Sequence, residues 1–204
     1  MISLKCMNEE LISKIREKAL NDGVPIMEDE GINYVRQFLK DNDVKSLLEI
    51  GTAVGYSSIV FASYCPDLHI TTVEIDQQRH QTAVKNIEEA GLTDRITAVL
   101  ANAREFECEE KFDVLFLDGP KAHNQQLLER FEKNLKEDGI IIVDDVYFHG
   151  FLDAQEDQIG KRLKPLVKKF KKFREDMLNS DKYESEYLQI GDGVMICRRR
   201  KQDD

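Results

Sequence analysis

Cysteine is scarce in this chain, and its spacing is uninformative for metal or disulfide chemistry. Of 204 residues only four are cysteines, and none stands in a Cys-x-x-Cys pair: Cys6, Cys65, Cys108 and Cys197. This scatter argues against a disulfide framework and against a cysteine zinc cluster. We expect reduced thiols that mostly fill the core.

Long hydrophobic runs are also missing. No apolar stretch approaches the roughly 20 residues that a membrane helix needs, and the amino-terminal residues lack the apolar core of a signal peptide. We therefore expect a cytoplasmic protein with no membrane partner. A content of 41% hydrophobic and 33% charged residues is ordinary for a globular protein, and the length fits one domain spanning 1–204.

Positive charge is low overall but concentrated in one segment. The net charge of −10 argues against general affinity for nucleic acid. Residues 161–174, KRLKPLVKKFKKFR, nevertheless carry eight basic and no acidic side chains, so the rest of the chain stands at −18. Apolar residues recur there at helical spacing, which places the basic ones on the other face. That face is either an ordinary solvated surface or one that attracts phosphates.

Short apolar runs alternate with helical patterns, which is typical of βα units around a parallel sheet. Strands are predicted at 46–50, 70–73, 96–100, 113–117 and 139–143. Helices are predicted near 9–21, 29–40, 56–64, 77–90, 122–136 and 153–178, the last kinked or restarted at Pro165. Residues 183–200 predict a hairpin across Gly191, Asp192 and Gly193. The predicted fold class is α/β, with a Rossmann-like, seven-stranded, mostly parallel sheet and a C-terminal antiparallel hairpin.

The dinucleotide fingerprint Gly-x-Gly-x-x-Gly is absent. In its place LLEIGTAVGYSS, residues 47–58, carries Gly51 and Gly55 between the first strand and its helix, and Glu74 ends the second strand. A glycine turn followed by an acidic residue that can accept two ribose hydroxyls indicates a nucleotide cofactor site. Because the spacing that admits a pyrophosphate is missing, S-adenosylmethionine is the leading candidate. An NAD-dependent oxidoreductase shares the early pattern but fails on this spacing.

Acidic residues follow the last two parallel strands. Asp118 ends FDVLFLD, and Asp144 and Asp145 end IIIVDD. Since ligands bind beyond the carboxyl ends of such strands, we expect these side chains and Glu74 to converge on one crevice. Hard cations such as Mg²⁺ or Mn²⁺ prefer carboxylate oxygens, whereas Zn²⁺ usually recruits His or Cys. The alternative is that strand-end acids cap helices or are simply solvated.

Four motifs in order, LLEIGTAVGYSS, TTVEID, FDVLFLDGPKAHN and IIIVDDV, resemble the metal-dependent O-methyltransferases that include the catechol and caffeoyl-CoA enzymes. The tail FREDMLNSDKYESEYLQIGDGVMICRRR adds a likeness to bacterial tRNA 5-hydroxyuridine O-methyltransferases. The resemblance covers the chain from Val24 onward and implies a class I methyltransferase fold.

This resemblance implies roles for individual residues. Cofactor binding falls to Ile26, Glu49, Gly51, Ser57, Glu74, Ala101, Ala103 and Asp118. Asp118, Asp144 and Asp145 are implied as ligands of Mg²⁺ or Mn²⁺, and Lys121 as the general base. The chemistry agrees, because methyl transfer needs an oxygen nucleophile with anionic character and a bound cation lowers the pKa of a hydroxyl.

The chain departs from the family pattern at three places. Asp145 replaces an asparagine, Gly119 replaces a small residue that is commonly Ala or His, and Asn124 replaces an aromatic. His123 and His149 lie near the site in sequence, and we expect them only to support it. His69 and His80 are expected at the surface.

The function implied is methylation of 5-hydroxyuridine in tRNA to 5-methoxyuridine, with tRNA bound by residues 161–174. Four further cations extend this basic segment in the hypothesis: Arg198, Arg199, Arg200 and Lys201. A small catechol-like or caffeoyl-CoA-like acceptor is the alternative, and a cofactor-binding module without catalysis is a third reading. A homodimer also stays open, since the helices at 9–21 and 29–40 lie outside the βα core pattern.

Overall fold

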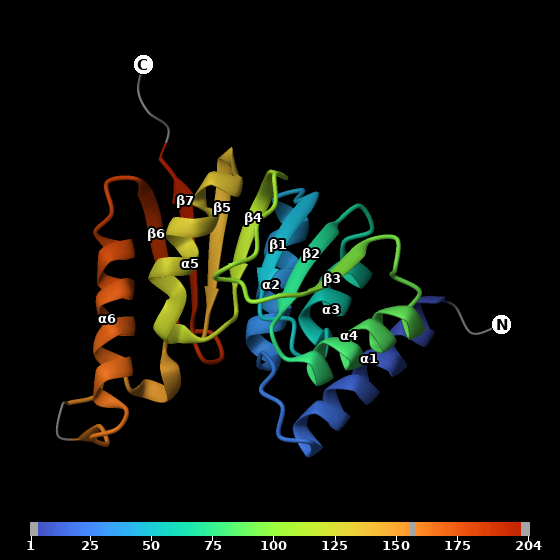
Figure 1. Ribbon diagram of the computed structural model, residues 1–204, viewed down its shortest axis with the longest axis horizontal. Helices are drawn as coiled ribbons and strands as arrows, with labels where there is room; N and C mark the ends of the chain where they lie inside the picture. Colours follow the sequence, from blue (N-terminus) through green and yellow to red (C-terminus); the bar gives the residue numbers. More distant parts are fainter. Residues whose placement is uncertain (1–3, 156–157, 201–204) are drawn as a thin grey trace.

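A single twisted sheet runs through the computed structural model, which describes residues 4–155 and 158–200 (Figure 1). Its strand order is β3-β2-β1-β4-β5-β7-β6. β1 to β5 are parallel, and β7 runs antiparallel to both β5 and β6. The strands are β1 Ser46–Ile50, β2 His69–Glu74, β3 Ile96–Leu100, β4 Phe112–Leu117, β5 Leu135–Asp144, β6 Tyr183–Leu188 and β7 Val194–Arg199. The predicted fold class and the C-terminal hairpin are confirmed.

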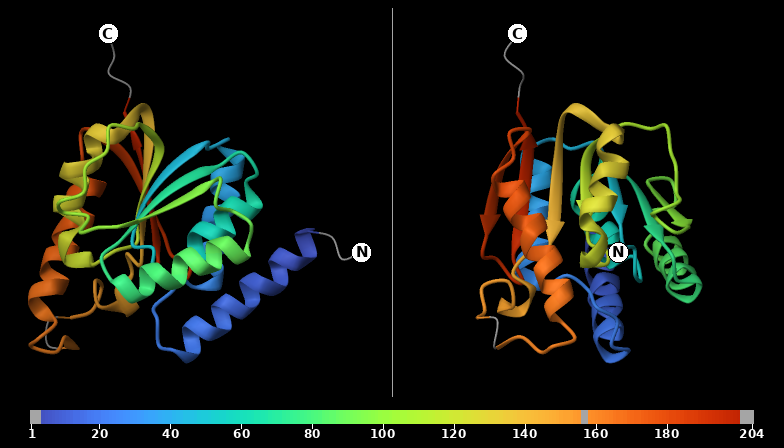
Figure 2. Two further views of the ribbon diagram at one scale, coloured as in Figure 1. Left: turned by 45° about the vertical axis from the view of Figure 1, so that its right-hand side comes forward. Right: turned by 60° about the vertical axis from the view of Figure 1, so that its left-hand side comes forward.

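Helices cover both faces of the sheet (Figure 2). On one face lie α1 Leu4–Asn21, α2 Asp29–Asp41, α3 Tyr56–Tyr64 and α4 Gln77–Glu89; on the other lie α5 Asn124–Phe131 and α6 Lys164–Leu178. Three short 3₁₀ helices, η1 Lys121–His123, η2 Glu132–Asn134 and η3 Phe148–Gly150, stand in the connections. Among the residues described, none of the helices has the length and apolar character needed to cross a membrane.

Successive side chains of each strand point to opposite faces of the sheet, so the core forms two hydrophobic clusters. Leu47 packs toward α2 and α3, whereas its neighbour Leu48 packs toward α5 and α6. Cys65 and Cys197 are buried free thiols and Cys108 is half-buried, in agreement with the expected reduced thiols; the side chain of Cys6 lies outside the described part. The two clusters pack against opposite faces of the sheet and so position its strand ends.

Two predicted helices are shorter in the structure. The helix expected at 122–136 ends at Phe131, because Leu135 already pairs with Phe112 at the start of β5. The helix expected from residue 153 begins only at Lys164, with Pro165 in its first turn, where a missing N–H costs nothing. The connection between β5 and α6 is therefore longer than predicted, and it begins directly at the carboxyl end of β5.

Candidate active site

The glycine turn after β1 is held against the end of β4. Gly51 has φ +110°, and a Cβ placed there would lie 2.4 Å from the carbonyl oxygen of Asp118. Only glycine tolerates both the backbone conformation and this approach. Gly55, with φ +81°, then starts α3. The chain order reverses between β1 and β4, which is where open α/β sheets bind ligands.

A pocket opens beside this turn. Its walls are Pro25, Ile26, Met27, Gly51, Thr52, Ala53, Tyr56, Ser57 and Asp118. Four of the predicted cofactor residues, Ile26, Gly51, Ser57 and Asp118, therefore face one space. The segment before α2 contributes the opposite wall, so the pocket is closed by a part of the chain remote in sequence from the turn.

Glu49 lies beneath the pocket and is completely buried. Its carboxylate accepts hydrogen bonds from Ser57 Oγ at 2.5 Å, from Thr72 Oγ1 at 2.5 Å and from Ser58 Oγ. Burial raises the pKa of Glu49, and the three hydroxyls oppose that shift. Such a satisfied buried carboxylate joins β1, α3 and β2 into one unit.

Glu74, at the end of β2, is also satisfied. Its Oε2 accepts from Ala53 N at 2.8 Å, and its Oε1 accepts from the amides of Ile75 and Asp76 at 2.9 and 2.8 Å. The Glu74 carbonyl in turn accepts from Ala101 N at 2.9 Å. Glu74 thus ties the glycine turn to the loop after β3 that contains Ala101 and Ala103, although none of these three lines the pocket.

Lys121 and the three aspartates meet at the carboxyl ends of β4 and β5. The Lys121 ammonium donates to the Asp144 carbonyl oxygen at 3.0 Å. It lies 3.8 Å from Asp118 Oδ1 and 3.6 Å from Asp145 Oδ2. The predicted metal ligands and predicted base are thus brought together, and Asp118 also links them to the pocket.

The carboxylates in this group repel one another. Removal from water, followed by the charge of Asp144, raises the pKa of Asp118 well above its ordinary value. Burial raises the pKa of Asp144 to about 6, against the favourable effect of Lys121. Asp145 has φ +58°, an uncommon backbone conformation for a residue other than glycine. The site therefore carries more negative charge than one lysine balances.

Comparison with known proteins identifies the family. A family model described as O-methyltransferase matches residues 2–200. The chain belongs to this O-methyltransferase family. Membership confirms the enzyme class expected from the sequence, an S-adenosylmethionine-dependent O-methyltransferase.

Individual relatives of this O-methyltransferase agree with that assignment. Caffeoyl-CoA O-methyltransferase of Populus kitakamiensis is 29% identical over 187 residues, which cover 87% of this chain and 79% of that protein. A Staphylococcus aureus protein, named provisionally as a caffeoyl-CoA O-methyltransferase, has a crystal structure with TM-score 0.88 and 31% identity, covering 93% of this chain and 92% of its own. The Bacillus cereus O-methyltransferase in complex with SAH has TM-score 0.79 at 22% identity, covering 94% and 91%, and shows the shared fold.

The three aspartates suit a hard divalent cation in their donor chemistry. They offer only carboxylate oxygens, and the Asp118–Asp144 repulsion is of the kind that a cation relieves. As they stand, however, no three His, Cys, Asp or Glu side chains among the described residues are grouped closely enough to hold one ion. The ammonium of Lys121 stands between the carboxylates instead. The donor chemistry fits, and ligation would require these side chains to move closer together.

Several contributors to the site were not predicted from the sequence. Thr72 holds Glu49, Ala53 holds Glu74, and Tyr56 and Met27 line the pocket. Thr72 could have been noticed as a polar residue within the apolar strand TTVE. His123 lies 3.3 Å from Gln126 through Nδ1 and Oε1, and His80 Nε2 lies 3.2 Å from the Ala98 carbonyl. His80 is half-buried rather than a surface residue, whereas His69 is exposed as expected; the His149 side chain lies outside the described part.

The basic segment is divided between two environments. Its apolar residues Val167, Phe170 and Phe173 are buried as predicted, and six cations are exposed: Lys161, Arg162, Lys168, Lys169, Lys171 and Lys172. Arg174 instead is only 8% exposed, so one of the eight expected surface cations lies inside the protein.

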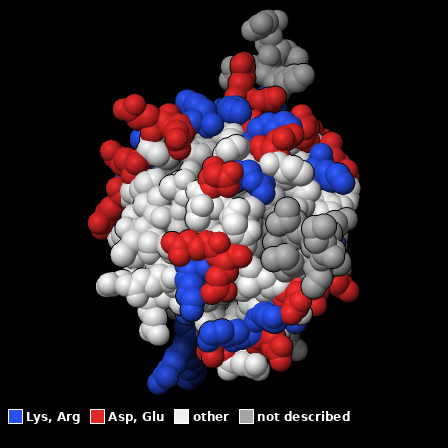
Figure 3. Space-filling model, turned by 90° about the vertical axis from the view of Figure 1, so that its right-hand side faces the viewer, with Lys and Arg blue, Asp and Glu red and all other residues white. Residues whose placement is uncertain are grey.

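Of the C-terminal cations, Arg198 and Arg200 are exposed and Arg199 is half-buried; Lys201 lies outside the described residues. The side of the molecule that lies opposite α6 has mixed charges around a broad uncharged area (Figure 3).

Proposed function

We propose that this enzyme methylates one of two adjacent oxygen atoms of an acceptor bound at the Lys121–aspartate group. The observation that carries the proposal is the meeting of Lys121 with Asp118 and Asp145 beside the glycine-turn pocket. An acceptor at this position lies next to the methyl donor. This arrangement suits in-line displacement from a sulfonium, which depends on positioning of the two reactants.

The donor is S-adenosylmethionine, held by the predicted cofactor residues. Ile26, Gly51 and Ser57 line the pocket that would take its methionine end. Glu74 keeps lone pairs beyond its three amide contacts and would accept the ribose hydroxyls. The loop with Ala101 and Ala103, fastened to Glu74, would flank the adenine. Glu49 supports the cofactor residues from below, because its carboxylate accepts hydrogen bonds from Ser57 Oγ and Thr72 Oγ1.

Asp118, Asp144 and Asp145 would hold Mg²⁺ or Mn²⁺, which when bound supplies positive charge that lowers the pKa of the acceptor hydroxyl. Lys121, in its amine form, takes the acceptor proton at Nζ. The Asp144 carbonyl, 3.0 Å away, orients that nitrogen. Only 11% of the Lys121 side chain is exposed, so the base is shielded from bulk water.

For the acceptor we propose 5-hydroxyuridine in tRNA, whose neighbouring O4 and O5 atoms form the required pair. The support is the exposed basic face of α6, where Lys168, Lys169 and Lys171 can contact phosphates. The first turn of α6 lies at the same end of the molecule as the glycine turn (Figure 1). RNA bound along α6 therefore has a path to the site.

The second candidate acceptor is a catechol-like small molecule. It is favoured by the relatives, among which the poplar protein is named a caffeoyl-CoA O-methyltransferase. A catechol presents the same adjacent oxygens, so the chemistry at Lys121 and the aspartates is unchanged. The two candidates differ only in whether α6 takes part.

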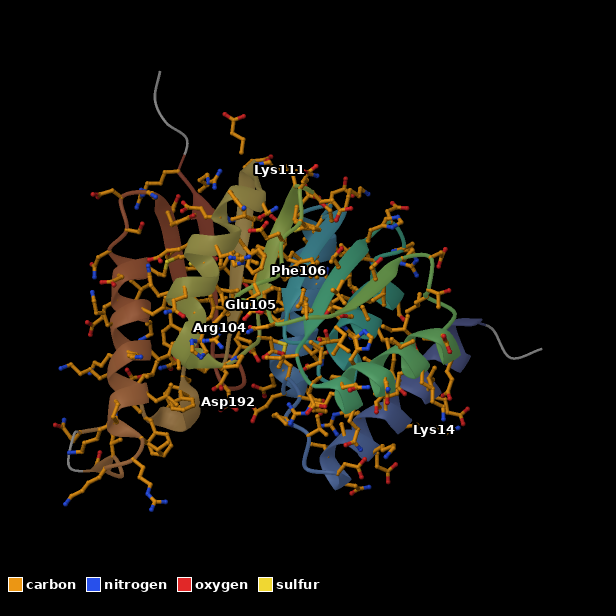
Figure 4. The ribbon with its side chains drawn as sticks, in the orientation of Figure 1. Lys14, Arg104, Glu105, Phe106, Lys111 and Asp192 are labelled. Carbon is orange, nitrogen blue, oxygen red and sulfur yellow. The ribbon has the colours of Figure 1, made fainter. Side chains whose placement is uncertain are left out.

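One experiment separates the acceptors. Labelled methyl transfer from S-adenosylmethionine is measured with tRNA that carries 5-hydroxyuridine and with catechol, each with Mg²⁺ and with chelator. The double variant Lys168→Glu/Lys169→Glu should raise the KM for tRNA at least tenfold and leave catechol unaffected. Lys14→Glu, on α1 at the far side of the molecule (Figure 4), is the matched control.

The outcomes are distinct. Transfer to catechol but not to tRNA selects the small acceptor. Transfer to neither, or transfer that chelator does not reduce, contradicts the proposed reaction.

A further inference from the structure

Arg174 differs from every other cation of the basic segment. Its Nη2 donates to Asp153 Oδ1 at 2.6 Å, and only 10% of its side chain is exposed. Its guanidinium lies over the ring of Tyr187, with Cζ 5.4 Å from the ring centroid. Nη1 is buried and, within the residues described, has no hydrogen-bond partner. One carboxylate and one ring therefore hold this charge in the interior.

Asp153 belongs to the connection that directly follows the aspartates of β5. The start of this connection is fixed to the β6–β7 turn: Val146 N donates to the Gly193 carbonyl at 3.0 Å, and Tyr147 N donates to the Asp192 carbonyl at 2.7 Å. Figure 4 shows Asp192 at the lower end of this hairpin. The connection is thus fastened at residues 146–147 by the hairpin and at Asp153 by Arg174.

Close packing joins these two attachments. Gly193 has φ +87°, and a Cβ there would lie 2.7 Å from Tyr147 N and 3.0 Å from Tyr187 Cε2. The hairpin residue that stacks on Arg174 therefore adjoins the turn that holds Tyr147. Loosening Arg174 would be transmitted through Tyr187 to the segment beside Asp145.

Asp145 needs such support. Its φ of +58° is a sparsely populated conformation that persists only when the surroundings impose it. The pairing of Asp144 with Val194 restrains the backbone immediately before it, and the hydrogen bonds of Val146 and Tyr147 restrain the backbone immediately after it. Without them the aspartate would relax toward a common backbone conformation and turn its carboxylate elsewhere.

We propose that Arg174 is a positioning residue for the acceptor half of the site, which consists of Lys121 and the three aspartates. It clamps residues 146–153 between α6 and the β6–β7 hairpin, and so keeps Asp145 and its neighbour Asp144 aligned with Lys121. The role of these aspartates rests on the proposed function. The clamp itself is a property of the fold and can be measured without any acceptor.

The test compares Arg174→Met and Asp153→Asn with Lys171→Met, an exposed cation of the same helix. Amide hydrogen exchange at Val146 and Tyr147 should become at least tenfold faster in the first two variants. Exchange at Gly51, whose amide donates to the Val73 carbonyl at 3.0 Å in the donor half, should stay unchanged. Lys171→Met should leave both sites as in the wild type.

Activity and metal binding give independent readouts. In Arg174→Met the kcat should fall about 10- to 100-fold while the KM for S-adenosylmethionine holds, and Mn²⁺ binding followed by electron paramagnetic resonance should weaken about tenfold. Arg174→Lys, which keeps the charge but loses the planar stack, should recover part of the loss.

Unchanged exchange at Val146 and Tyr147 in both clamp variants overturns the proposal. If Arg174→Met unfolds, Asp153→Asn decides it, because that side chain is 47% exposed and asparagine keeps an oxygen that can accept from Arg174 Nη2. An enzyme with fast exchange in the variants but no methyl transfer in the wild type keeps the clamp and contradicts the proposed function.

Discussion

β4 has an aspartate near each end, and the surroundings shift the pKa values of the two carboxyl groups in opposite directions. Near its amino end Asp113 accepts from Ser46 N and Ser46 Oγ at 2.8 Å and from Lys136 Nζ at 2.7 Å. These contacts outweigh partial burial and lower the pKa of Asp113. After its carboxyl end Asp118 faces another carboxylate, and its pKa is raised well above the ordinary value.

The two ends of β4 therefore differ in how well their carboxylate charge is compensated. Asp113 joins β1, β4 and β5 and is matched by donors on every side. Asp118 and Asp144 are held close together with Lys121 as the shared cation, an arrangement that costs stability in the free protein and favours positively charged ligands. Perturbed carboxylates that lie together beside a pocket are typical of functional sites.

The largest effect should come from removing the lysine at the carboxyl end. We expect Lys121→Met to lower kcat about 1,000-fold, since a general base contributes about 10² to 10⁴. The control is Lys136→Met, which removes the lysine at the other end of β4. It should leave kcat within about twofold. Equal losses in both variants would erase the functional contrast between the ends.

The next largest effect is expected from the packing of the glycine turn against the carboxyl end of β4. Gly51→Ala should destabilise the protein by about 3 kcal/mol, because its Cβ meets the Asp118 backbone and its φ excludes other residues. Gly91→Ala, with φ +65° and open space around the Cβ, should cost only about 1 kcal/mol. Urea denaturation measures both; similar costs would mean that the turn can move away from β4.

A smaller effect is expected at the amino end. Asp113→Asn should cost about 1 to 2 kcal/mol at pH 7 through weaker charge-assisted hydrogen bonds. Because the folded-state pKa is lowered, this stabilisation exists above the unfolded pKa and is lost as pH falls through the folded value. The free energies of unfolding of variant and wild type should therefore converge below about pH 4. A constant difference across pH would contradict the charge argument.

The smallest effect has the opposite sign. Without divalent cations, Asp118→Asn should stabilise the protein by up to about 1 kcal/mol at pH 7, because it removes a carboxylate whose charged form is disfavoured by burial and by Asp144. Asp145 still pairs with Lys121 in this variant. Thermal unfolding in chelator measures the gain. A destabilisation as large as that of Asp113→Asn would show that the two ends are not built differently.

The sequence predicts those features that depend on local pattern and topology. Buried apolar runs mark β1 to β5, and the rule that parallel strand ends share an edge brings Asp118 and Asp144 together. The glycine spacing also locates the turn at Gly51 correctly. These signals are contained within a few adjacent residues, so a single sequence reveals them.

The features that the sequence does not show depend on contacts between residues that are far apart in the chain. Arg174 stands in a run of cations and looks like them, yet its burial is set by Asp153 and Tyr187. Likewise, helical periodicity from residue 153 onward does not reveal that the β6–β7 turn binds Val146 and Tyr147, or that α6 begins only at Lys164. Long-range contacts overrode local preference at both places.

The position of β7 has a consequence for synthesis of the chain. β7 lies between β5 and β6, and the turn before it fastens the segment after Asp145. The donor half, which consists of the residues that line the glycine-turn pocket from Pro25 to Asp118, leaves the ribosome well before this strand. A nascent chain would therefore contain every residue of the proposed cofactor pocket before it contains the strand and turn that fasten the segment after Asp145.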